Sequence, residues 1–245
     1  MITRYTTYEI ARKGLEPFLP PLYRRVRTKL VEEVTSKKGE CSILDVGGRK
    51  SPYTIGVQAR VTVIDLPRET EIQNSLNLGI NDAIVEQVKN RRSNIHEFIF
   101  GDMTRSDLPS NSFDLVVSVE VLEHVEEDER FVAEVKRVLK PGGKFIMTTP
   151  NGDFVVNRNP DHKRHYKRQQ LSDLLCRSFE SVNVEYAVIG GRYRKLGLRS
   201  WSARRPLWTL SSAVGNVVNS IQSSRPGIEN QSHGTHHLFA VAQKS

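Results

Sequence analysis

The sequence has little cysteine: only Cys41 and Cys176 occur in 245 residues. They lie far apart and match no zinc-ligand spacing, so neither a disulfide framework nor a cysteine zinc site is supported. The sequence also has no run of the roughly 20 apolar residues that a membrane-spanning helix needs, and its first residues lack the apolar core of a signal peptide. We therefore expect a protein of the reducing cytoplasm.

The remaining composition is that of an ordinary globular chain, with 38% hydrophobic and 26% charged residues. This balance disfavours disorder over the whole length. The net charge of +8 favours anionic partners, which include nucleic acids, phosphorylated or nucleotide-linked sugars and anionic lipid surfaces. Charge alone does not choose among them.

Short apolar runs of strand length alternate with helical or polar segments from Cys41 onward. They lie at residues 42–46, 61–64, 98–100, 115–119 and 145–148, and two further runs lie at 182–189 and 237–242. Helical spacing marks residues 22–34 and 128–139, the latter ending at Pro141-Gly142-Gly143, and a further helix is expected over 169–177. The alternation predicts an α/β fold with a mostly parallel sheet covered by helices on both faces.

These patterns divide the chain into four parts. Residues 1–40 form a helical lead-in, residues 41–190 the core and residues 234–245 its last strand. Residues 191–233 form an insertion with structure of its own, because a hairpin loop is far shorter.

The first two predicted strands end in residues suited to a nucleoside. Asp45 is followed by the turn Gly47-Gly48, and Asp65 ends the next strand about 20 residues later. A glycine turn lets the backbone approach a ligand, and a carboxylate at the second strand tip can accept both ribose hydroxyls. The alternative is that Gly47-Gly48 is only a tight turn.

Later motifs come in a specific order. Gly101-Asp102-Met103 follows the third strand, Glu120-Val121-Leu122-Glu123-His124 follows the fourth, and Leu139-Lys140-Pro141-Gly142-Gly143 precedes the fifth. From about residue 42 to residue 175, the sequence resembles the class I S-adenosylmethionine-dependent methyltransferases. It is most similar to the small-molecule O-methyltransferase branch, which includes ubiquinone-biosynthesis enzymes and sugar and natural-product methyltransferases.

The resemblance implies a Rossmann-like sheet of seven strands, the last of them antiparallel, and a set of cofactor contacts. Asp45 and Gly47 would line the methionine part of S-adenosylmethionine, Asp65 would bind its ribose, and Asp102 with Met103 would hold the adenine. The predicted contacts also include Gly48, Arg49, Leu66 and Glu120.

Two of these positions leave alternatives open. Asp102 is also a typical helix cap. Arg49 stands where relatives usually carry a glycine, and it either pairs with the methionyl carboxylate or points to solvent.

Glu120, Glu123 and His124 are spaced i, i+3 and i+4, which places them on one face if the segment is helical. With His162 they form a predicted site for a divalent cation, Mg²⁺ or Mn²⁺. This pattern resembles one in the ubiquinone O-methyltransferases and the small-RNA 2′-O-methyltransferases, which use it to hold a metal. The alternatives are metal-free positioning or base catalysis, and structural hydrogen bonding.

His165, His162 and His124 are the predicted catalytic residues, since a neutral imidazole can take a proton from a hydroxyl. The segment that holds His162 and His165 resembles a His-x-Arg-x-Tyr motif of small-molecule methyltransferases. The alternative is a solvated basic stretch before a helix.

The insertion carries seven basic residues and a single acidic one, Glu229. We expect it to cover the acceptor site and to meet an anionic substrate or membrane surface, because arginine pairs well with phosphate and tryptophan suits an interface. One apolar helix face is expected from Trp208, Leu210, Val214, Val217, Val218 and Ile221. The alternative is that this face packs on the domain.

The sequence thus predicts transfer of a methyl group to a hydroxyl of a small molecule, such as a sugar, a phenol or quinol, or a lipid-linked acceptor. The alternatives are an RNA-directed 2′-O-methyltransferase and a non-catalytic nucleotide-binding regulatory protein. Nucleic acid is not the expected partner, because no RNA-binding module is recognisable.

Overall fold

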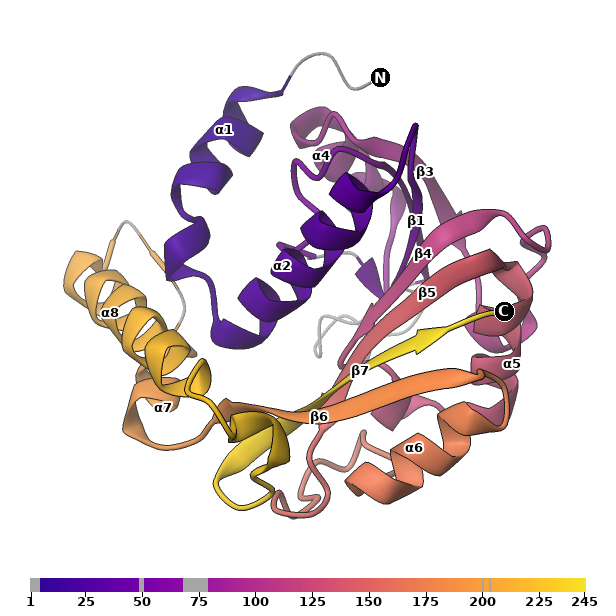
Figure 1. Cartoon of the computed structure of the whole chain (residues 1–245). Helices are drawn as coiled ribbons and strands as arrows, with labels where there is room; N and C mark the ends of the chain where they lie inside the picture. Colours follow the sequence, from indigo (N-terminus) through magenta and orange to yellow (C-terminus); the bar gives the residue numbers. More distant parts are fainter. Residues whose placement is uncertain (1–4, 49–50, 68–78, 200, 203) are drawn as a thin grey trace.

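Seven strands form one sheet in the computed structural model, which describes residues 5–48, 51–67, 79–199, 201–202 and 204–245 (Figure 1). The strand order is β3-β2-β1-β4-β5-β7-β6, and β7 alone runs antiparallel to its neighbours among the described strands. The strands are β1 Ser42–Val46, β2 Arg60–Asp65, β3 Ile95–Phe100, β4 Phe113–Val119, β5 Leu139–Pro150, β6 Ser181–Ile189 and β7 Thr235–Gln243. The predicted fold class is confirmed.

Helices cover both faces of the sheet. They are α1 Thr7–Gly14, α2 Pro21–Ser36, α4 Asp82–Arg91, α5 Asp128–Val138, α6 Arg168–Cys176, α7 Arg192–Gly197 and α8 Pro206–Ser223. On one face, Val26 and Leu30 of α2 pack with Ile43 and Leu115 of the strands. On the other face, α5 and α6 pack against the sheet with side chains that include Phe131, Leu171 and Phe145. Each face therefore has its own buried apolar cluster.

The boundary between α5 and β5 differs from the sequence prediction. The helix ends at Val138, and β5 begins at Leu139, before the Pro141-Gly142-Gly143 segment. The extended backbone is already paired there, since Phe113 of β4 lies opposite Leu139. Gly142, with a φ of +73°, donates its N–H to Lys244 O at 2.8 Å. The Pro-Gly-Gly segment is therefore an irregular part of a strand and does not end the helix.

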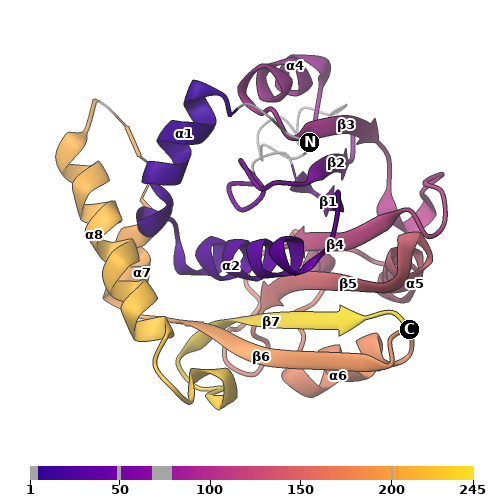
Figure 2. The ribbon, with the colours of Figure 1, turned by 45° about the horizontal axis from the view of Figure 1, so that its top comes forward.

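The insertion before β7 folds as two helices, α7 and α8, which pack on each other (Figure 2). It follows β6 directly, so it lies at the edge of the sheet where the parallel strands end. The side chain of Asn216 on α8 donates to Phe18 O at 3.0 Å, which joins α8 to the lead-in. No helix in the described ranges is long and apolar enough to cross a bilayer.

Candidate active site

The predicted cofactor residues gather at the carboxyl edge of the sheet. Neighbouring parallel strands end together there, because Val46 of β1 pairs with Ile64 of β2 and with Ser118 of β4. The turn after β1, Asp65 and Glu120 consequently follow three adjacent strands. In open α/β sheets this crevice is where ligands bind.

The turn after β1 needs both of its glycines. Gly47 has a φ of +71° and donates its N–H to Ile64 O at 2.8 Å. A Cβ atom at Gly48 would lie 2.3 Å from the carboxyl carbon of Asp45. A side chain at Gly48 would collide with Asp45, so the turn is tight for a steric reason. Arg49 lies outside the described residues.

Asp45 is fully buried and is bonded within the protein. Its carboxylate accepts from the Tyr53 hydroxyl at 3.1 Å and from Thr54 Oγ1 at 3.0 Å. Arg92 in turn donates to Thr54 Oγ1 at 2.8 Å. Burial raises the pKa of Asp45 to about 6, although hydrogen bonds and Arg92 oppose the shift. Asp45 thus organises the loop that follows β1, and its contact with the methionine part of a cofactor stays a prediction.

Asp65 has the properties of a ribose acceptor. It ends β2, and within the described residues its carboxylate accepts one hydrogen bond, from Leu66 N at 2.8 Å. Burial raises its pKa to about 6. A partly buried carboxylate with few partners among the described residues suits hydroxyl donors. The next side chain, Leu66, is 47% exposed, so an apolar surface adjoins the carboxylate.

Asp102 and Met103 have different surroundings from those implied by the resemblance. Asp102 caps the short helix η3 (Met103–Arg105), because Thr104 donates its N–H to Asp102 Oδ1 at 2.8 Å. Met103 is buried in the core, so only its backbone could reach a ring at the surface. The exposed apolar side chain at the end of β3 is Phe100, which the sequence analysis did not single out.

Glu120 has an unusual backbone and two polar neighbours. Its φ is +55°, in the left-handed region that few residues with a side chain adopt. Thr148 donates to its Oε1 at 3.0 Å, and His237 Nδ1 lies 3.2 Å from its Oε2. Burial raises the pKa of Glu120, but His237 and Thr148 outweigh it and leave the pKa below its usual range. Arg194 of α7 lies 3.4 Å from His237 Nε2.

Glu123 is buried in the short helix η4 (Leu122–His124). Its Oε2 accepts from Thr149 Oγ1 at 3.1 Å, and its Oε1 has no hydrogen-bond partner among the described residues. Burial, together with the charge of Glu120, raises the pKa of Glu123 well above its usual value. Glu123 therefore presents one unpartnered oxygen.

Three histidines cluster near that oxygen: His162 and His165 share a hydrogen bond, and the ring of His124 packs edge-on against that of His162. His165 Nδ1 lies 2.9 Å from Val155 O, and His165 Nε2 lies 2.8 Å from His162 Nδ1. A carbonyl only accepts, so we assign the hydrogens to His165 Nδ1 and His162 Nδ1, which leaves a lone pair on His162 Nε2. His124 Nδ1 lies 3.1 Å from Asp161 O, which by the same reasoning frees its Nε2. Burial and the other two histidines lower the pKa of His162.

Glu123, His124 and His162 each offer one ligand atom, and these atoms lie within 4.8 Å of one another. Glu120 does not belong to this group. The expected shared helical face does not form, because η4 is a single short turn and the left-handed backbone at Glu120 directs its carboxylate to Thr148 and His237. The prediction that Glu120 shares a helical face with Glu123 and His124 was based on their spacing in sequence alone.

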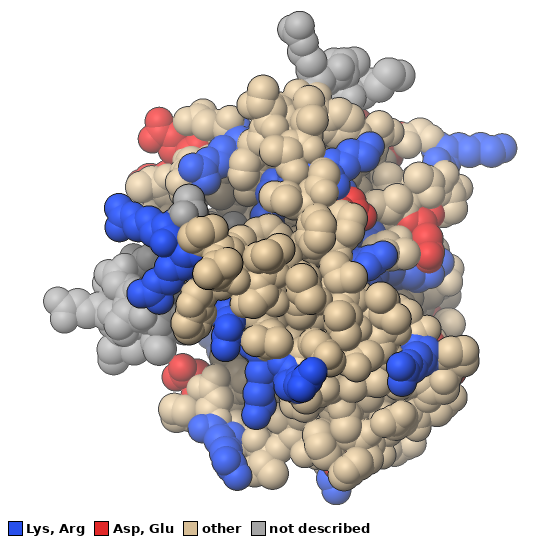
Figure 3. All heavy atoms as spheres, turned by 90° about the vertical axis from the view of Figure 1, so that its left-hand side faces the viewer, with Lys and Arg blue, Asp and Glu red and all other residues tan. Residues whose placement is uncertain are grey.

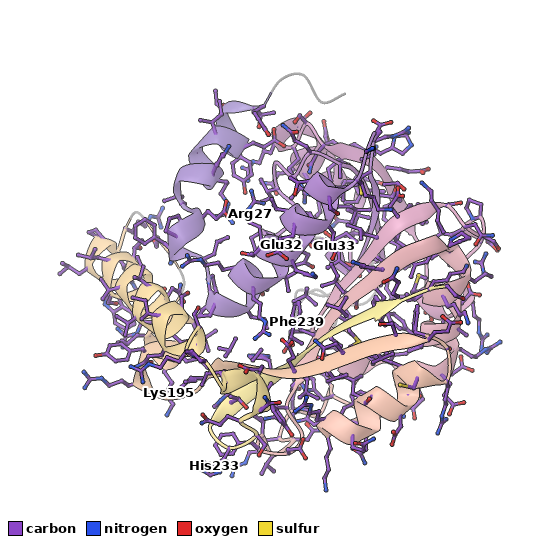
Figure 4. All side chains as sticks on the ribbon, in the orientation of Figure 1. Arg27, Glu32, Glu33, Lys195, His233 and Phe239 are labelled. Carbon is purple, nitrogen blue, oxygen red and sulfur yellow. The ribbon has the colours of Figure 1, made fainter. Side chains whose placement is uncertain are left out.

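A groove of about 760 Å³ lies elsewhere, between α2, β6, β7 and the segment after α8. Glu32 of α2 and Phe239 of β7 line it (Figure 4). None of the predicted cofactor or catalytic residues lines this groove. Of its basic residues, Arg25 is paired with Glu185, and Lys29 and Lys144 are paired with Glu33. The candidate active site is therefore the carboxyl edge.

Comparisons with known proteins concern the family and the fold. Residues 44–147 match the family model of a methyltransferase domain. The chain carries a class I S-adenosylmethionine-dependent methyltransferase domain. The matched segment begins in β1 and includes Asp45, Asp65, Asp102, Glu120 and Glu123, whereas His162 and His165 follow it.

Two curated relatives are about one third identical to this chain over the aligned residues. A probable S-adenosylmethionine-dependent methyltransferase of Mycolicibacterium smegmatis is 33% identical over 58% of this chain and 56% of its own length. A sterol 24-C-methyltransferase of Aspergillus fumigatus is 32% identical over 64% of this chain and 40% of its own length. The chain thus spans little more than half of these relatives at most.

Solved structures share the fold. A methyltransferase of Archaeoglobus fulgidus has a TM-score of 0.56 at 16% identity, covering 91% of this chain and 94% of its own. Phosphoethanolamine N-methyltransferase 2 of Haemonchus contortus, in complex with S-adenosyl-L-methionine, has a TM-score of 0.56 at 16% identity, covering 89% and 52%. At these identities the likeness concerns the fold alone.

Proposed function

We propose that this chain transfers the methyl group of S-adenosylmethionine to a hydroxyl oxygen of a small molecule. The observation that supports this most is the histidine cluster, which leaves a hydrogen-bond-accepting nitrogen on His162 at the carboxyl edge. The cofactor supplies an electrophilic methyl carbon on a sulfonium. The protein must hold the cofactor, orient the acceptor and remove one proton.

The residues at the ends of β1 and β2 fit the cofactor. Asp65 offers carboxylate oxygens to the ribose, and Leu66 offers an apolar surface beside it. The Gly47-Gly48 turn, kept free of Cβ atoms, lets the backbone approach the ligand. Asp102 caps η3 through Oδ1, so its other carboxylate oxygen is the atom suited to an adenine amino group.

His162 is the proposed base. As the acceptor oxygen bonds to the methyl carbon and the carbon–sulfur bond breaks, the hydroxyl proton passes to His162 Nε2. The resulting imidazolium keeps its Nδ1–H bond to His165, which is held by Val155 O. Burial keeps His162 neutral and ready to accept, since the pKa of His162 is lowered. His165 is then a positioning residue.

A divalent cation is the second candidate for activating the hydroxyl. One carboxylate and two imidazole nitrogens form a plausible three-ligand set, and the unpartnered Glu123 Oε1 is an observation in its favour. A cation there would lower the hydroxyl pKa and require ionised Glu123. In that case Glu123, His124 and His162 are all needed together.

Carbon and nitrogen acceptors are the competing chemistries. Sterol C-methyltransferases are among the relatives, and an N-methyltransferase is among the structural neighbours. RNA methylation and a non-catalytic regulatory role are weaker alternatives: no RNA-binding module is recognisable in the sequence, and the cofactor acids and the histidine cluster are retained.

Methyl transfer from labelled S-adenosylmethionine to a panel of phenols, sugars, lipid-linked alcohols, sterols and amines tests the proposal. We expect label on a hydroxyl compound, and a fall in kcat of about a hundredfold in His162→Ala. His96→Ala, an exposed histidine on β3, is the matched control and should keep full activity. Label that appears only on sterol carbon or amine nitrogen would contradict the proposal.

Chelation separates the two mechanisms. If His162 acts as a base, activity survives exhaustive chelation and Glu123→Gln retains turnover. If a cation acts, chelation abolishes turnover, Mn²⁺ or Mg²⁺ restores it, and Glu123→Gln is inactive. Full activity of both His162→Ala and Glu123→Gln would rule out both mechanisms.

A further inference from the structure

Helix α8 carries its apolar residues on the outside. Leu207 is 77% exposed, Leu210 61%, Val214 51% and Ile221 64%, and they share one helix face. The buried residues of α8 lie on the opposite face, and all are small or polar: Ser212, Gly215, Asn216, Asn219 and Ser220. The usual arrangement of a surface helix is reversed here.

Specific contacts fix this orientation. A Cβ atom at Gly215 would lie 2.9 Å from Gly197 N, and one at Gly197 would lie 2.1 Å from Asn216 Oδ1, so α7 and α8 cross in close contact. Asn219 donates to Ile189 O at 2.8 Å, and Ser212 donates to Gly197 O at 2.9 Å. Rotating α8 to bury its apolar face would break these bonds, so that face stays outside.

Basic residues surround the exposed apolar face. Residues 191–233 carry seven basic residues and one acid, and α8 itself has no charged residue. The molecular face in Figure 3 shows uncharged atoms at its centre with lysines and arginines around them and few acids. Lys195 of α7 points away from the sheet on this side of the molecule (Figure 4). The exposed arginines of the insertion are Arg192, Arg199, Arg204, Arg205 and Arg225.

The two tryptophans of the chain lie in the same region. Trp208 is 50% exposed on α8, and the guanidinium carbon of Arg199 lies 4.5 Å from its ring centre. Trp201 is 36% exposed, and its Nε1 donates to Ser212 Oγ at 3.1 Å. An amphipathic aromatic ring beside cationic side chains is typical of a surface that meets lipid headgroups.

We propose that α8 binds parallel to the surface of an anionic phospholipid bilayer, with Leu207, Leu210, Val214 and Ile221 in the boundary between headgroups and acyl chains. The surrounding arginines then meet lipid phosphates. A second copy of this chain fits less well, because two cationic rims would face each other. The helix lies on the membrane and does not cross it.

This membrane face is one helix away from the candidate active site. Arg194 of α7 contacts His237, which contacts Glu120 at the carboxyl edge. A docked α8 would therefore hold the acceptor side of the crevice near the bilayer, which suits a lipid-linked acceptor. The binding itself does not depend on the proposed methyl transfer, because it is measured without any acceptor.

Vesicle binding of the full chain tests the proposal. We expect the protein to bind vesicles with 30% phosphatidylserine or phosphatidylglycerol at least about tenfold more tightly than vesicles of pure phosphatidylcholine. Added salt should weaken this binding. Since Trp201 and Trp208 are the only tryptophans, their emission should shift to the blue and be quenched by brominated lipids.

Two variants separate the apolar and electrostatic contributions. The double variant Leu207→Asp with Leu210→Asp should bind at least about tenfold more weakly, and acids near a helix start do not harm folding. Arg204→Glu with Arg205→Glu should lose the preference for anionic lipid. Val156→Ser, which changes a side chain 71% exposed and distant in sequence, is the control and should bind like the parent.

Binding of S-adenosylhomocysteine and the circular dichroism spectrum report on the fold of each variant. If variants and parent bind vesicles equally, or the tryptophan emission does not change, the proposal fails. A concentration-dependent dimer that Leu207→Asp with Leu210→Asp abolishes, without vesicle binding by the parent, would assign the face to a second copy instead.

Discussion

Glu120 and Glu123 lie three residues apart, yet the fold lowers the pKa of the Glu120 carboxyl and raises that of the Glu123 carboxyl. Burial raises the pKa of both carboxyls. Glu120 has His237 at 3.2 Å, whereas the Glu123 carboxylate accepts from the Thr149 hydroxyl and is repelled by Glu120. Without a cation, the proton of this pair is therefore held by Glu123 in preference to Glu120.

Glu123→Gln should stabilise the metal-free protein at alkaline pH. Because the folded-state pKa of Glu123 is raised above 4.5, folding takes up a proton, and stability falls as pH rises above that value. Glutamine needs no proton. The free energy of unfolding of the variant should therefore rise relative to that of the parent by up to about 1.4 kcal/mol for each unit of increasing pH. Urea unfolding at pH 5, 7 and 8 with a chelator measures this. A constant difference across pH would contradict it.

Cofactor affinity should weaken below pH 6. The pKa of Asp65 is raised to about 6 by burial, and a protonated carboxyl accepts ribose hydroxyl bonds poorly. Calorimetry with S-adenosylhomocysteine from pH 5 to 8 should show affinity rising with pH and reaching a plateau above about pH 7. Asp65→Asn should bind more weakly at pH 8 and lose most of the pH dependence. An Asp65→Asn variant that keeps the full pH dependence would assign it to another group, with Asp45 next in line.

Gly215→Ala should destabilise the fold by about 1–3 kcal/mol, since the added methyl meets the backbone of α7 within 2.9 Å. Gly14→Ala is the matched control: nothing lies within 4 Å of its Cβ position, and it should be neutral or slightly stabilising. Thermal unfolding of the two variants tests the close crossing of α7 and α8. Equal melting temperatures would mean that the helices are not packed this tightly.

Asp114 should support stability at neutral pH and lose this role in acid. Hydrogen bonds from Lys140, Lys37 and Ser42 outweigh burial and hold the pKa of Asp114 below its usual range. Its contribution is therefore complete above about pH 4 and is lost as pH falls below that. Asp114→Asn should unfold at lower denaturant than the parent at pH 7, with a smaller difference at pH 3. A difference that grows in acid would exclude this ion-pair account.

The sheet was predictable from sequence because its strands are short apolar runs that alternate with helical segments. β1 was placed at its observed bounds, and the acid that ends β2 was found from spacing alone. The end of α5 at Val138 was not predictable, because Pro141 and Gly142 are as compatible with an irregular strand as with a helix end.

The site was only partly predictable. The spacing of Glu123 and His124 and the later cluster with His162 and His165 predicted candidate residues. The sequence could not show that a left-handed backbone turns Glu120 toward His237. His237 comes from β7, more than a hundred residues later, and no local pattern marked it. The apolar face of α8 was visible as a periodicity, whereas its outward orientation depends on Asn216, Asn219 and the glycine crossing.

The position of β7 has a consequence for synthesis on the ribosome. β5 and β6 do not pair with each other; both pair with β7, which is made after α7 and α8. Until residues 235–243 leave the exit tunnel, β5 and β6 each present an open edge of unpaired backbone groups, which are prone to pair with other chains. A nascent chain that stalls within α8 is therefore the stage at which we expect aggregation or chaperone capture.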